Sequence, residues 1–414
     1  MKKLTNKLLS KTRGLINASD YCARHKKSET DFTRSRRMGF TDIMGLCLNF
    51  LRKSLQVEID RYMELTDPDL ERAVTKQAFS KARHKISPDA FRELFEMTGQ
   101  TILEEDAFGR YKGYRVFAID GMELQLPKSK QISQIFYPRQ NSFCPHARAS
   151  VLCDVITGFS IHSAINTIGC AERVLAMEHL RYFEQYKGES DLIIFDRGYP
   201  SRAMLEYLDG AGYTYLMRLQ RSFNAEIDTC TKRDFQMKLF GLRVRVVKLA
   251  LPSGEEEMLI TNLHKSAFTT SEFKALYHLR WGIETKYNTL KNKLDIENFS
   301  GKTHTTVLQD FYATLFLSNI AASLKSEANE IIRKDNAAKS LKYEYIPNEN
   351  VLIGKLKDKL VLILLNPDPC KRELLLDKLV AQIAARRVAI VPDRAFPRPS
   401  ASHKRACNKL KSAL

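Results

Sequence analysis

The chain has 414 residues, which is enough for two or three domains and at least one sizeable core. Hydrophobic residues make up 44% of the chain, which excludes a largely disordered protein. Lysine plus arginine exceed aspartate plus glutamate by 66 − 48 = 18, and this excess favours a polyanionic partner, most simply nucleic acid.

Several other classes are not expected. No apolar run reaches the roughly 18 residues of a membrane span, and the basic N-terminus is not followed by the apolar core of a signal peptide. The cysteines form no C-x-x-C pair, so a structural zinc site is not expected. Scattered thiols in a chain of this length favour a reducing compartment, and we expect a cytoplasmic protein.

The first part of the chain, to about residue 110, is predicted to be helical. Ser87-Pro88-Asp89 is a typical helix start, with serine at the N-cap and proline in the first turn. The segment 76–85 carries several cations on a predicted helix, Lys81 and Arg83 among them. Such a helix could lie on a phosphate backbone or in a groove, but an ordinary solvated basic face explains it equally well.

From residue 114 the pattern changes to short apolar runs. The run 114–119 predicts a buried strand that ends at Asp120, and the run 191–195 predicts a second one that ends at Asp196. Glu172 begins a predicted helix, where it could orient a neighbour of a site or simply partner the helix dipole. The remaining elements expected here are strands at 147–155, 158–165 and 213–219 and helices at 171–186 and 200–208.

Residues 220–264 interrupt this alternation of strands and helices. The segment 242–249 alternates apolar and basic residues, which is typical of a half-exposed strand. Arg243 and Arg245 are expected on its solvent side, with Lys248 as a further candidate there. Residues 258–261 are its expected partner, after a turn at 252–254.

The segment 277–291 is predicted to form one helix. At 100° per residue, one face presents Tyr277, Arg280, Glu284 and Lys291, while Lys286 points to solvent. A carboxylate between cations suits a site for metal ions and phosphates. Mixed charges on a helix face are, however, more often a solvated surface.

The rest of the chain is predicted to be mainly helical. Residues 306–332 form a core helix against the sheet, followed by a loop at 337–349 and helices at 350–365 and 372–387. The tail from residue 391, rich in proline, arginine and lysine, is expected to be disordered unless bound.

Three carboxylates from separate parts of the chain are candidates for one site. Asp120 and Asp196 end two strands and Glu284 lies on a later helix; in a sheet-and-helix fold such strand ends converge. Their oxygens suit Mg²⁺, and a pair of ions about 4 Å apart can activate an attacking hydroxyl at a phosphodiester. Asp154 and Glu123 compete with Asp120 as first ligand, and Asp120-Gly121 alone is more typical of a turn.

These residues resemble a known family. Tyr277, Arg280, Glu284 and Lys291 match the pattern Y-x2-R-x3-E-x6-K of the DDE transposases of the insertion sequence four family, without any change of spacing. The contexts Phe-Ala-Ile-Asp-Gly at 117–121 and Phe-Asp-Arg-Gly-Tyr at 195–199 are similar to the family as well. The resemblance covers roughly residues 75–305; one departure is Met122, where a small polar residue is expected.

The resemblance implies an α/β fold: a ribonuclease-H-like mixed sheet with flanking helices, a β-strand insertion and a helical N-terminal domain. It implies Asp120, Asp196 and Glu284 as catalytic metal ligands for Mg²⁺, with Mn²⁺ able to substitute. It implies double-stranded DNA, both transposon ends and target, as partner of a homodimer on paired ends, in a bacterial cytoplasm. The residues then expected to contact DNA are Tyr277, Arg280 and Lys291, with Arg197, Trp281, Arg243, Arg245, Lys81 and Arg83 as further candidates.

For Trp281, the only tryptophan, packing is the simpler expectation and stacking on a base the alternative. The expected activity is cut-and-paste transposition through a hairpin. The rivals are a metal-dependent nuclease or resolvase without strand transfer, and a DNA-binding protein without catalysis. The expected parts are a DNA-binding helical domain at 1–110, the catalytic core at 111–219 and 267–335, the insertion at 220–266, and a helical C-terminal region with a basic tail at 336–414.

Overall fold

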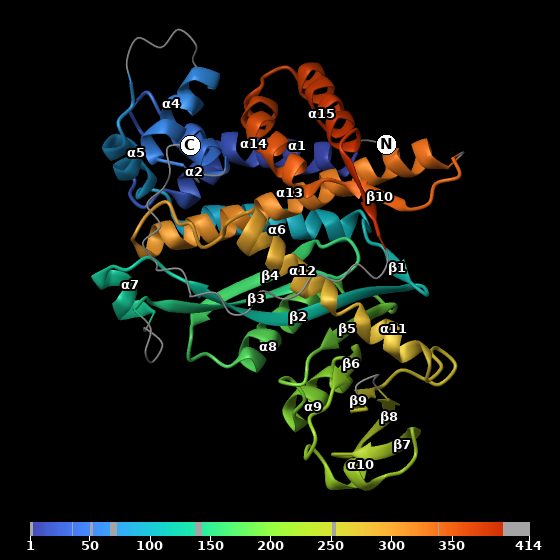
Figure 1. Ribbon diagram of the computed structural model, residues 1–414. Helices are drawn as coiled ribbons and strands as arrows, with labels where there is room; N and C mark the ends of the chain where they lie inside the picture. Colours follow the sequence, from blue (N-terminus) through green and yellow to red (C-terminus); the bar gives the residue numbers. More distant parts are fainter. Residues whose placement is uncertain are drawn as a thin grey trace. The chain divides into compact units, whose positions relative to one another are not determined.

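The computed structural model describes residues 3–34, 36–49, 53–66, 73–136, 143–250, 254–337 and 339–391. The chain forms two compact units (Figure 1). The first comprises Met1–Thr101, Gln125–His146 and Asn288–Leu414, and the second comprises Ile102–Leu124 and Ala147–Tyr287. The five parts expected from the sequence are a finer division, and their boundaries stay a prediction.

The first unit is built mainly of helices. They are α1 (Leu4–Asn17), α2 (Ser19–His25), α3 (Phe40–Cys47), α4 (Leu55–Thr66), α5 (Lys76–Arg83), α6 (Pro88–Glu104), α7 (Lys130–Ile135), the π-helical turn η2 (Thr289–Lys293), α13 (His304–Asn336), α14 (Glu349–Leu365) and α15 (Pro369–Ala384). Its central helix, α13, contacts α1, α14 and α15. The helix predicted at 306–332 is therefore confirmed and extended at both ends, whereas its predicted packing against the sheet stays a prediction.

Two expectations fail in the C-terminal region. The predicted loop at 337–349 contains strand β10 (Glu344–Pro347), and the predicted helix at 372–387 ends at Ala384 and is followed by β11 (Arg387–Ile390). The two strands pair antiparallel, Tyr345 opposite Ala389. They are too short to carry a clear alternation in the sequence. The predicted disordered tail lies outside the described residues apart from its first residue, Val391.

In the second unit, nine described strands form one mixed sheet. In sequence order they are β1 (Arg110–Tyr111), β2 (Tyr114–Gln125), β3 (His146–Asp154), β4 (Ser160–Thr167), β5 (Asp191–Phe195), β6 (Thr214–Arg218), β7 (Asp234–Leu239), β8 (Leu242–Ala250) and β9 (Glu256–Thr261). Their order across the sheet is β4-β3-β2-β5-β6-β9-β8-β7, with β1 paired to β2. The expected mixed α/β sheet with flanking helices is confirmed.

The centre of the sheet is parallel and fully buried. Strand β5 pairs parallel with β2 on one side and with β6 on the other. All five residues of β5 are buried, as its continuous apolar run predicts for a strand covered on both faces. The side-chain direction alternates along each strand, so the two faces of β2 and β5 have separate roles.

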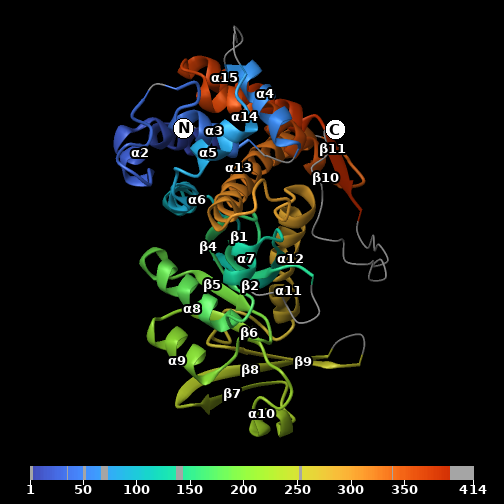
Figure 2. The same ribbon diagram turned by 90° about the vertical axis from the view of Figure 1, so that its left-hand side faces the viewer.

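Helices cover both faces (Figure 2). One face carries α8 (Glu172–Phe183), whose Phe183 ring lies 4.9 Å from that of Phe117, and the 3₁₀ turn η1 (Glu184–Tyr186) follows it. The helix α9 (Arg202–Gly210) begins with Ser201 as N-cap, and its side chain accepts from Met204 N. The other face carries α11 (Glu272–His278), followed by α12 (Trp281–Asn288).

The expected insertion contains more elements than predicted, and its strands belong to the same sheet. Strands β9, β8 and β7 continue antiparallel beyond β6, and they are seen at the end of the sheet in Figure 2. The sequence analysis did not identify β7 or the short helix α10 (Ala225–Thr229). Of the expected turn at 252–254, only Gly254 lies within the described residues, with a φ of 81°.

A pair of buried histidines joins α8 to the sheet. The Nδ1 atoms of His162 in β4 and His179 in α8 share a hydrogen bond of 2.7 Å, and Tyr182 stacks on His162 at 4.2 Å. Burial, reinforced by the neighbouring His162, lowers the pKa of His179 well below its ordinary value of 6.5. The folded state therefore favours the neutral form of His179.

This pair makes the fold sensitive to acid. Below about pH 6.5, His179 binds a proton in the unfolded chain but stays neutral in the folded chain. The contribution of this residue should therefore lower the free energy of unfolding by up to about 1.4 kcal/mol for each pH unit of acidification. Urea unfolding between pH 7.5 and 5 measures the slope. His179→Phe should flatten it, whereas the exposed control His264→Asn should not. An identical slope in all three proteins would contradict this account.

Candidate active site

The register of two parallel strands brings the two aspartates together. Val116 pairs with Leu192 and Ala118 with Ile194, each of the last pair two residues before an aspartate. Asp120 is in phase with Val116 and Ala118 along β2, and Asp196 follows directly after β5. The charge of Asp196 helps to raise the pKa of Asp120, as expected for neighbouring carboxylates.

The strand at Asp120 differs from the prediction. The sequence analysis ended this strand at Asp120, but β2 continues to Gln125, and Asp120 lies within it. Its backbone carbonyl accepts hydrogen bonds from the hydroxyls of Ser150, at 2.9 Å, and of Tyr287. The neighbouring strand β5 does end at Phe195, directly before Asp196. Thus one carboxylate is held by a continuous strand and the other by the start of a turn.

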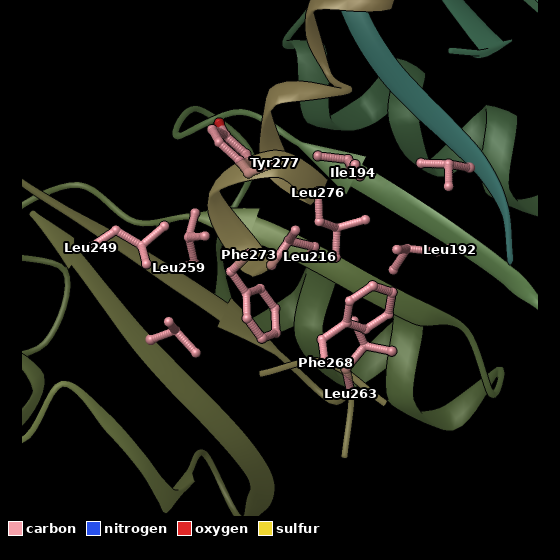
Figure 3. Close-up of a cluster of buried hydrophobic side chains, with 12 residues drawn as sticks. Leu192, Ile194, Leu216, Leu249, Leu259, Leu263, Phe268, Phe273, Leu276 and Tyr277 are labelled. Atoms are coloured by element: carbon pink, nitrogen blue, oxygen red, sulfur yellow. The ribbon is translucent and has the colours of Figure 1, made fainter. Parts of the chain in front are cut away.

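Helix α11 is fixed to this face by an apolar cluster (Figure 3). Its residues Phe273 and Leu276 pack with Leu192 and Ile194 of β5, all buried. Tyr277 ends the cluster, and its hydroxyl donates to Asp196 Oδ1 at 3.3 Å. The hydrophobic stripe of the helix therefore sets the position of a polar contact at the site.

The single helix predicted at 277–291 is interrupted. Helix α11 ends at His278, α12 begins at Trp281, and residues 289–293 form a π-helical turn. At the interruption Arg280 N donates to Tyr277 O, and Gly282 N to Leu279 O, both three residues back. This tighter spacing is typical of 3₁₀ turns at helix ends.

Arg280 lies between two of the predicted carboxylates. Its Nη2 is 2.5 Å from Glu284 Oε1 and its Nη1 is 3.4 Å from Asp120 Oδ2. The arginine side chain is mostly buried at 12% exposure, whereas that of Glu284 is 44% exposed. One guanidinium thus links the sheet carboxylate to the helix carboxylate, and it compensates part of their charge.

Burial makes the carboxyl group of Asp120 a weaker acid than an ordinary aspartate. It raises the pKa of this carboxyl to about 6, and the charges of Asp196 and Glu172 act in the same direction. The hydrogen bond from Gly121 N and the charge of Arg280 oppose the rise. An additional positive charge beside Asp120 would therefore stabilise its ionised form.

A glycine sets the approach of α12. A Cβ on Gly282 would lie 2.8 Å from Val155 Cβ and would also meet the Val155 carbonyl oxygen. Only glycine lets the helix lie this close to the end of β3. Lys286, one turn later, was expected in solvent but is buried, and its ammonium donates to Gly158 O at 2.7 Å. Both contacts hold α12 against the β3–β4 turn.

Two of the predicted DNA-contacting arginines are buried in ion pairs. Arg83 is 2% exposed and donates to Asp310 at 2.7 Å within the first unit. Arg245 is 2% exposed and pairs with Asp234 at 2.7 Å, and Lys248 is also buried. The expectation that Arg245 and Lys248 face solvent is wrong. Arg245 also donates to the carbonyls of His264 and Phe268, and Lys248 donates to the carbonyl of Cys230, so neighbouring segments bury both side chains.

Other predicted residues are accessible. Arg197, Arg243 and Lys81 are exposed. Lys291 belongs to the first unit, where its ammonium lies 3.5 Å from Glu297. Trp281, expected to pack, is 49% exposed and stacks on His278 with ring centroids 5.8 Å apart.

The two rival ligands have other roles. Asp154 is fully buried and accepts from Thr157 N at 2.7 Å, which stabilises the turn between β3 and β4. Glu123 is three residues beyond Asp120 on β2, so its side chain leaves the opposite face. Neither shares the face of Asp120 and Asp196.

Carboxylates suit a hard divalent cation as ligands, but in this structure the guanidinium of Arg280 already lies beside two of them. Within the described part of the chain, no three histidine, cysteine, aspartate or glutamate side chains lie close enough to hold a metal ion as they stand. Arg280 lies between Asp120 and Glu284 and provides the positive charge there. The carboxylate oxygens themselves are the ligands that Mg²⁺ prefers.

Known proteins resemble this chain over most of its length. Residues 111–320 match the family described as Transposase DDE domain. The chain is 23% identical over 302 residues to the transposase InsG for insertion sequence element IS4 from Escherichia coli strain K12, covering 67% of each protein. A cryo-EM structure of the piggyBac transposase synaptic complex with hairpin DNA aligns with 95% of this chain and 87% of that chain, at 13% identity and a TM-score of 0.49.

The close approach at Gly282 yields a stability prediction. Gly282→Ala should lower the free energy of unfolding by about 1–3 kcal/mol, because the added methyl group meets Val155 in a packed interface. The matched control is Gly354→Ala in α14, where a Cβ meets nothing within 4 Å and should stabilise by about 0.5–1 kcal/mol. Urea unfolding of both variants measures the difference. Equal effects at the two glycines would contradict the proposed packing.

Proposed function

Because the chain belongs to the transposase DDE family, we propose that it binds the terminal inverted repeats of an insertion sequence and catalyses metal-dependent DNA cleavage and strand transfer. The observation that carries the proposal is the grouping of its carboxylates. Asp120 lies in β2 and Asp196 directly follows the neighbouring strand β5, and Arg280 contacts both Asp120 and Glu284. The net charge of +18 suits a DNA partner.

In the proposed reaction water attacks the phosphodiester at the end of the element. The new bond joins the water oxygen to phosphorus, the bond from phosphorus to the 3′ oxygen breaks, and a free 3′ hydroxyl results. That hydroxyl then attacks a phosphodiester of the opposite strand, which closes a hairpin and releases the flanking DNA with a 3′ hydroxyl. Water opens the hairpin and restores the 3′ hydroxyl of the element. This hydroxyl attacks a phosphodiester of the target DNA and displaces the 3′ oxygen of the target strand. We place these steps on a homodimer that pairs two ends.

The roles of the side chains follow from their contacts. Asp120, Asp196 and Glu284 would hold Mg²⁺, or Mn²⁺ in its place, and the bound cation would supply activation of the attacking oxygen and stabilisation of the leaving one. Tyr277 orients Asp196 through its hydroxyl. Arg280 would exchange a carboxylate contact for the scissile phosphate, since a guanidinium suits both anions. Lys291, Arg197, Arg243 and Lys81 are left as candidate contacts to the DNA backbone.

Cleavage of end DNA with Mg²⁺ tests the assignment of the carboxylates. Asp120→Asn and Glu284→Gln should each reduce nicking by at least about 100-fold, since even outer-shell partners of a metal cost 10–100-fold. The exposed control Asp209→Asn should keep the wild-type rate. Nicking that survives Glu284→Gln would rule out the proposed role of Glu284.

The same assay separates the rival functions. A transposase joins the freed 3′ end to a target plasmid, whereas a nuclease or resolvase without strand transfer gives nicked ends only. A DNA-binding protein without catalysis binds the terminal repeat and leaves it intact in every variant.

Trp281 gives a direct measure of DNA binding because it is the chain's only tryptophan and is half exposed beside the site. We expect end DNA to quench its fluorescence through stacking on a base. Trp281→Ala should weaken binding by about 1–3 kcal/mol and Trp281→Phe by less. Emission that stays unchanged at saturating end DNA, with unaltered affinity in Trp281→Ala, would contradict a stacking role.

A further inference from the structure

Glu172 approaches the two aspartates from the opposite face of the sheet. It is the first residue of α8, and its carboxylate lies against Gly121, where a Cβ would be 2.9 Å from Glu172 Oε1. A Cβ on Gly198 would be 3.9 Å from Glu172 Oε2. Gly121 follows Asp120 in β2, and Gly198 lies two residues after Asp196. The carboxylate therefore occupies space that these glycines leave open beside the two strands.

A buried hydroxyl provides a second, independent observation. Tyr199 is 1% exposed, and its hydroxyl has no hydrogen-bond partner among the described residues. Burial raises the pKa of this phenol well above 10, and the charges of Asp120, Glu172 and Asp196 raise it further, while the charge of Arg148 lowers it. A buried hydroxyl without a partner costs stability and calls for a specific explanation.

The simpler account of Glu172 is an ion pair at a helix start. Arg148 Nε lies 3.9 Å from Glu172 Oε1, while Arg148 Nη1 already donates to Cys170 O at 2.6 Å. The Glu172 side chain is 41% exposed, and such a long, exposed pair contributes about 0–1 kcal/mol. Neither this pair nor the helix dipole explains why the carboxylate lies against Gly121 or why the Tyr199 hydroxyl is unpaired.

We propose that Glu172 is a fourth acidic residue of the divalent-cation site, reaching it from α8 through the space left by Gly121 and Gly198. This inference rests on the proposed function. Glu172 adds an oxygen donor beside Asp120 and Asp196, and the Tyr199 hydroxyl donates to a water or carboxylate oxygen in the shell of the bound cation. Arg218 already pairs with Glu257 beside these groups, so among the described residues the four carboxylates face only Arg280 and Arg148. The excess negative charge is one that a divalent cation compensates.

Binding of Mn²⁺ to the full chain without DNA tests the proposal, followed by electron paramagnetic resonance. Glu172→Gln, which keeps the shape and removes the charge, should weaken Mn²⁺ affinity by about 10-fold or more. The matched control is Glu178→Gln, an exposed glutamate on the same helix, which should leave the affinity unchanged. Glu172→Asp, which retains the charge, should recover part of the loss.

Two further variants probe the surroundings, with circular dichroism and thermal unfolding as checks of folding. Gly121→Ala should displace the Glu172 carboxylate and weaken Mn²⁺ binding in the same direction. Tyr199→Phe should weaken it less than Glu172→Gln, because only a hydrogen bond is lost.

The outcomes are distinguishable. If Asp120→Asn loses Mn²⁺ while Glu172→Gln binds it as tightly as Glu178→Gln does, the fourth acidic residue is overturned and the proposed function stands. If the wild type binds no Mn²⁺ at millimolar concentration, the metal-dependent function fails and this inference with it. If Glu172→Gln weakens Mn²⁺ binding and Glu178→Gln does not, the inference is supported.

Discussion

The parallel pairing of β2 with β5 is the constraint on which the site depends. It brings Asp120, within β2, near Asp196, which directly follows β5. The charge of Asp196 disfavours the charged form of Asp120, and the burial of Asp120 increases the cost of its charge further. A fold that keeps such a pair has to supply positive charge beside it. The contacts around Asp120 and Asp196 can be understood as responses to this requirement.

Arg280 supplies positive charge beside these carboxylates. Its guanidinium contacts Asp120 and Glu284 together, so it takes the place that a cation between these carboxylates would need. Its Nε is buried without a partner among the described residues, so the pairing leaves one donor unsatisfied. An arginine held in this way is stabilised by the carboxylates but not fully satisfied by them. That is a suitable state for a side chain that changes partner when a cation and a phosphate arrive.

The sequence predicted the central elements well because their signals are local. The apolar run of β5 and the helix start at Ser87-Pro88-Asp89 each need only their own neighbourhood, and both are confirmed. The errors arise where a segment far away in the sequence determines whether a side chain is buried. Arg245 alternates like a solvent-facing residue, but β7 supplies Asp234 to bury it. Arg83 looks like part of a basic face, but Asp310, far along the chain, pairs with it. No pattern around either arginine reports these partners.

The site shows the same division between local and distant information. Spacing identified Tyr277, Arg280 and Glu284 as one face, and the contacts of Arg280 agree with that even though the helix is interrupted beside it. The interruption itself depends on where the two helices are fixed. Helix α11 is held by the apolar cluster under Phe273, and α12 is held by Gly282 against Val155. A straight helix could make only one of these two contacts, whereas the turn at residues 279–280 lets α11 and α12 each make its own. The tyrosine and the glutamate are thereby positioned by different parts of the sheet, and Arg280, at the turn, contacts the carboxylates that both parts present.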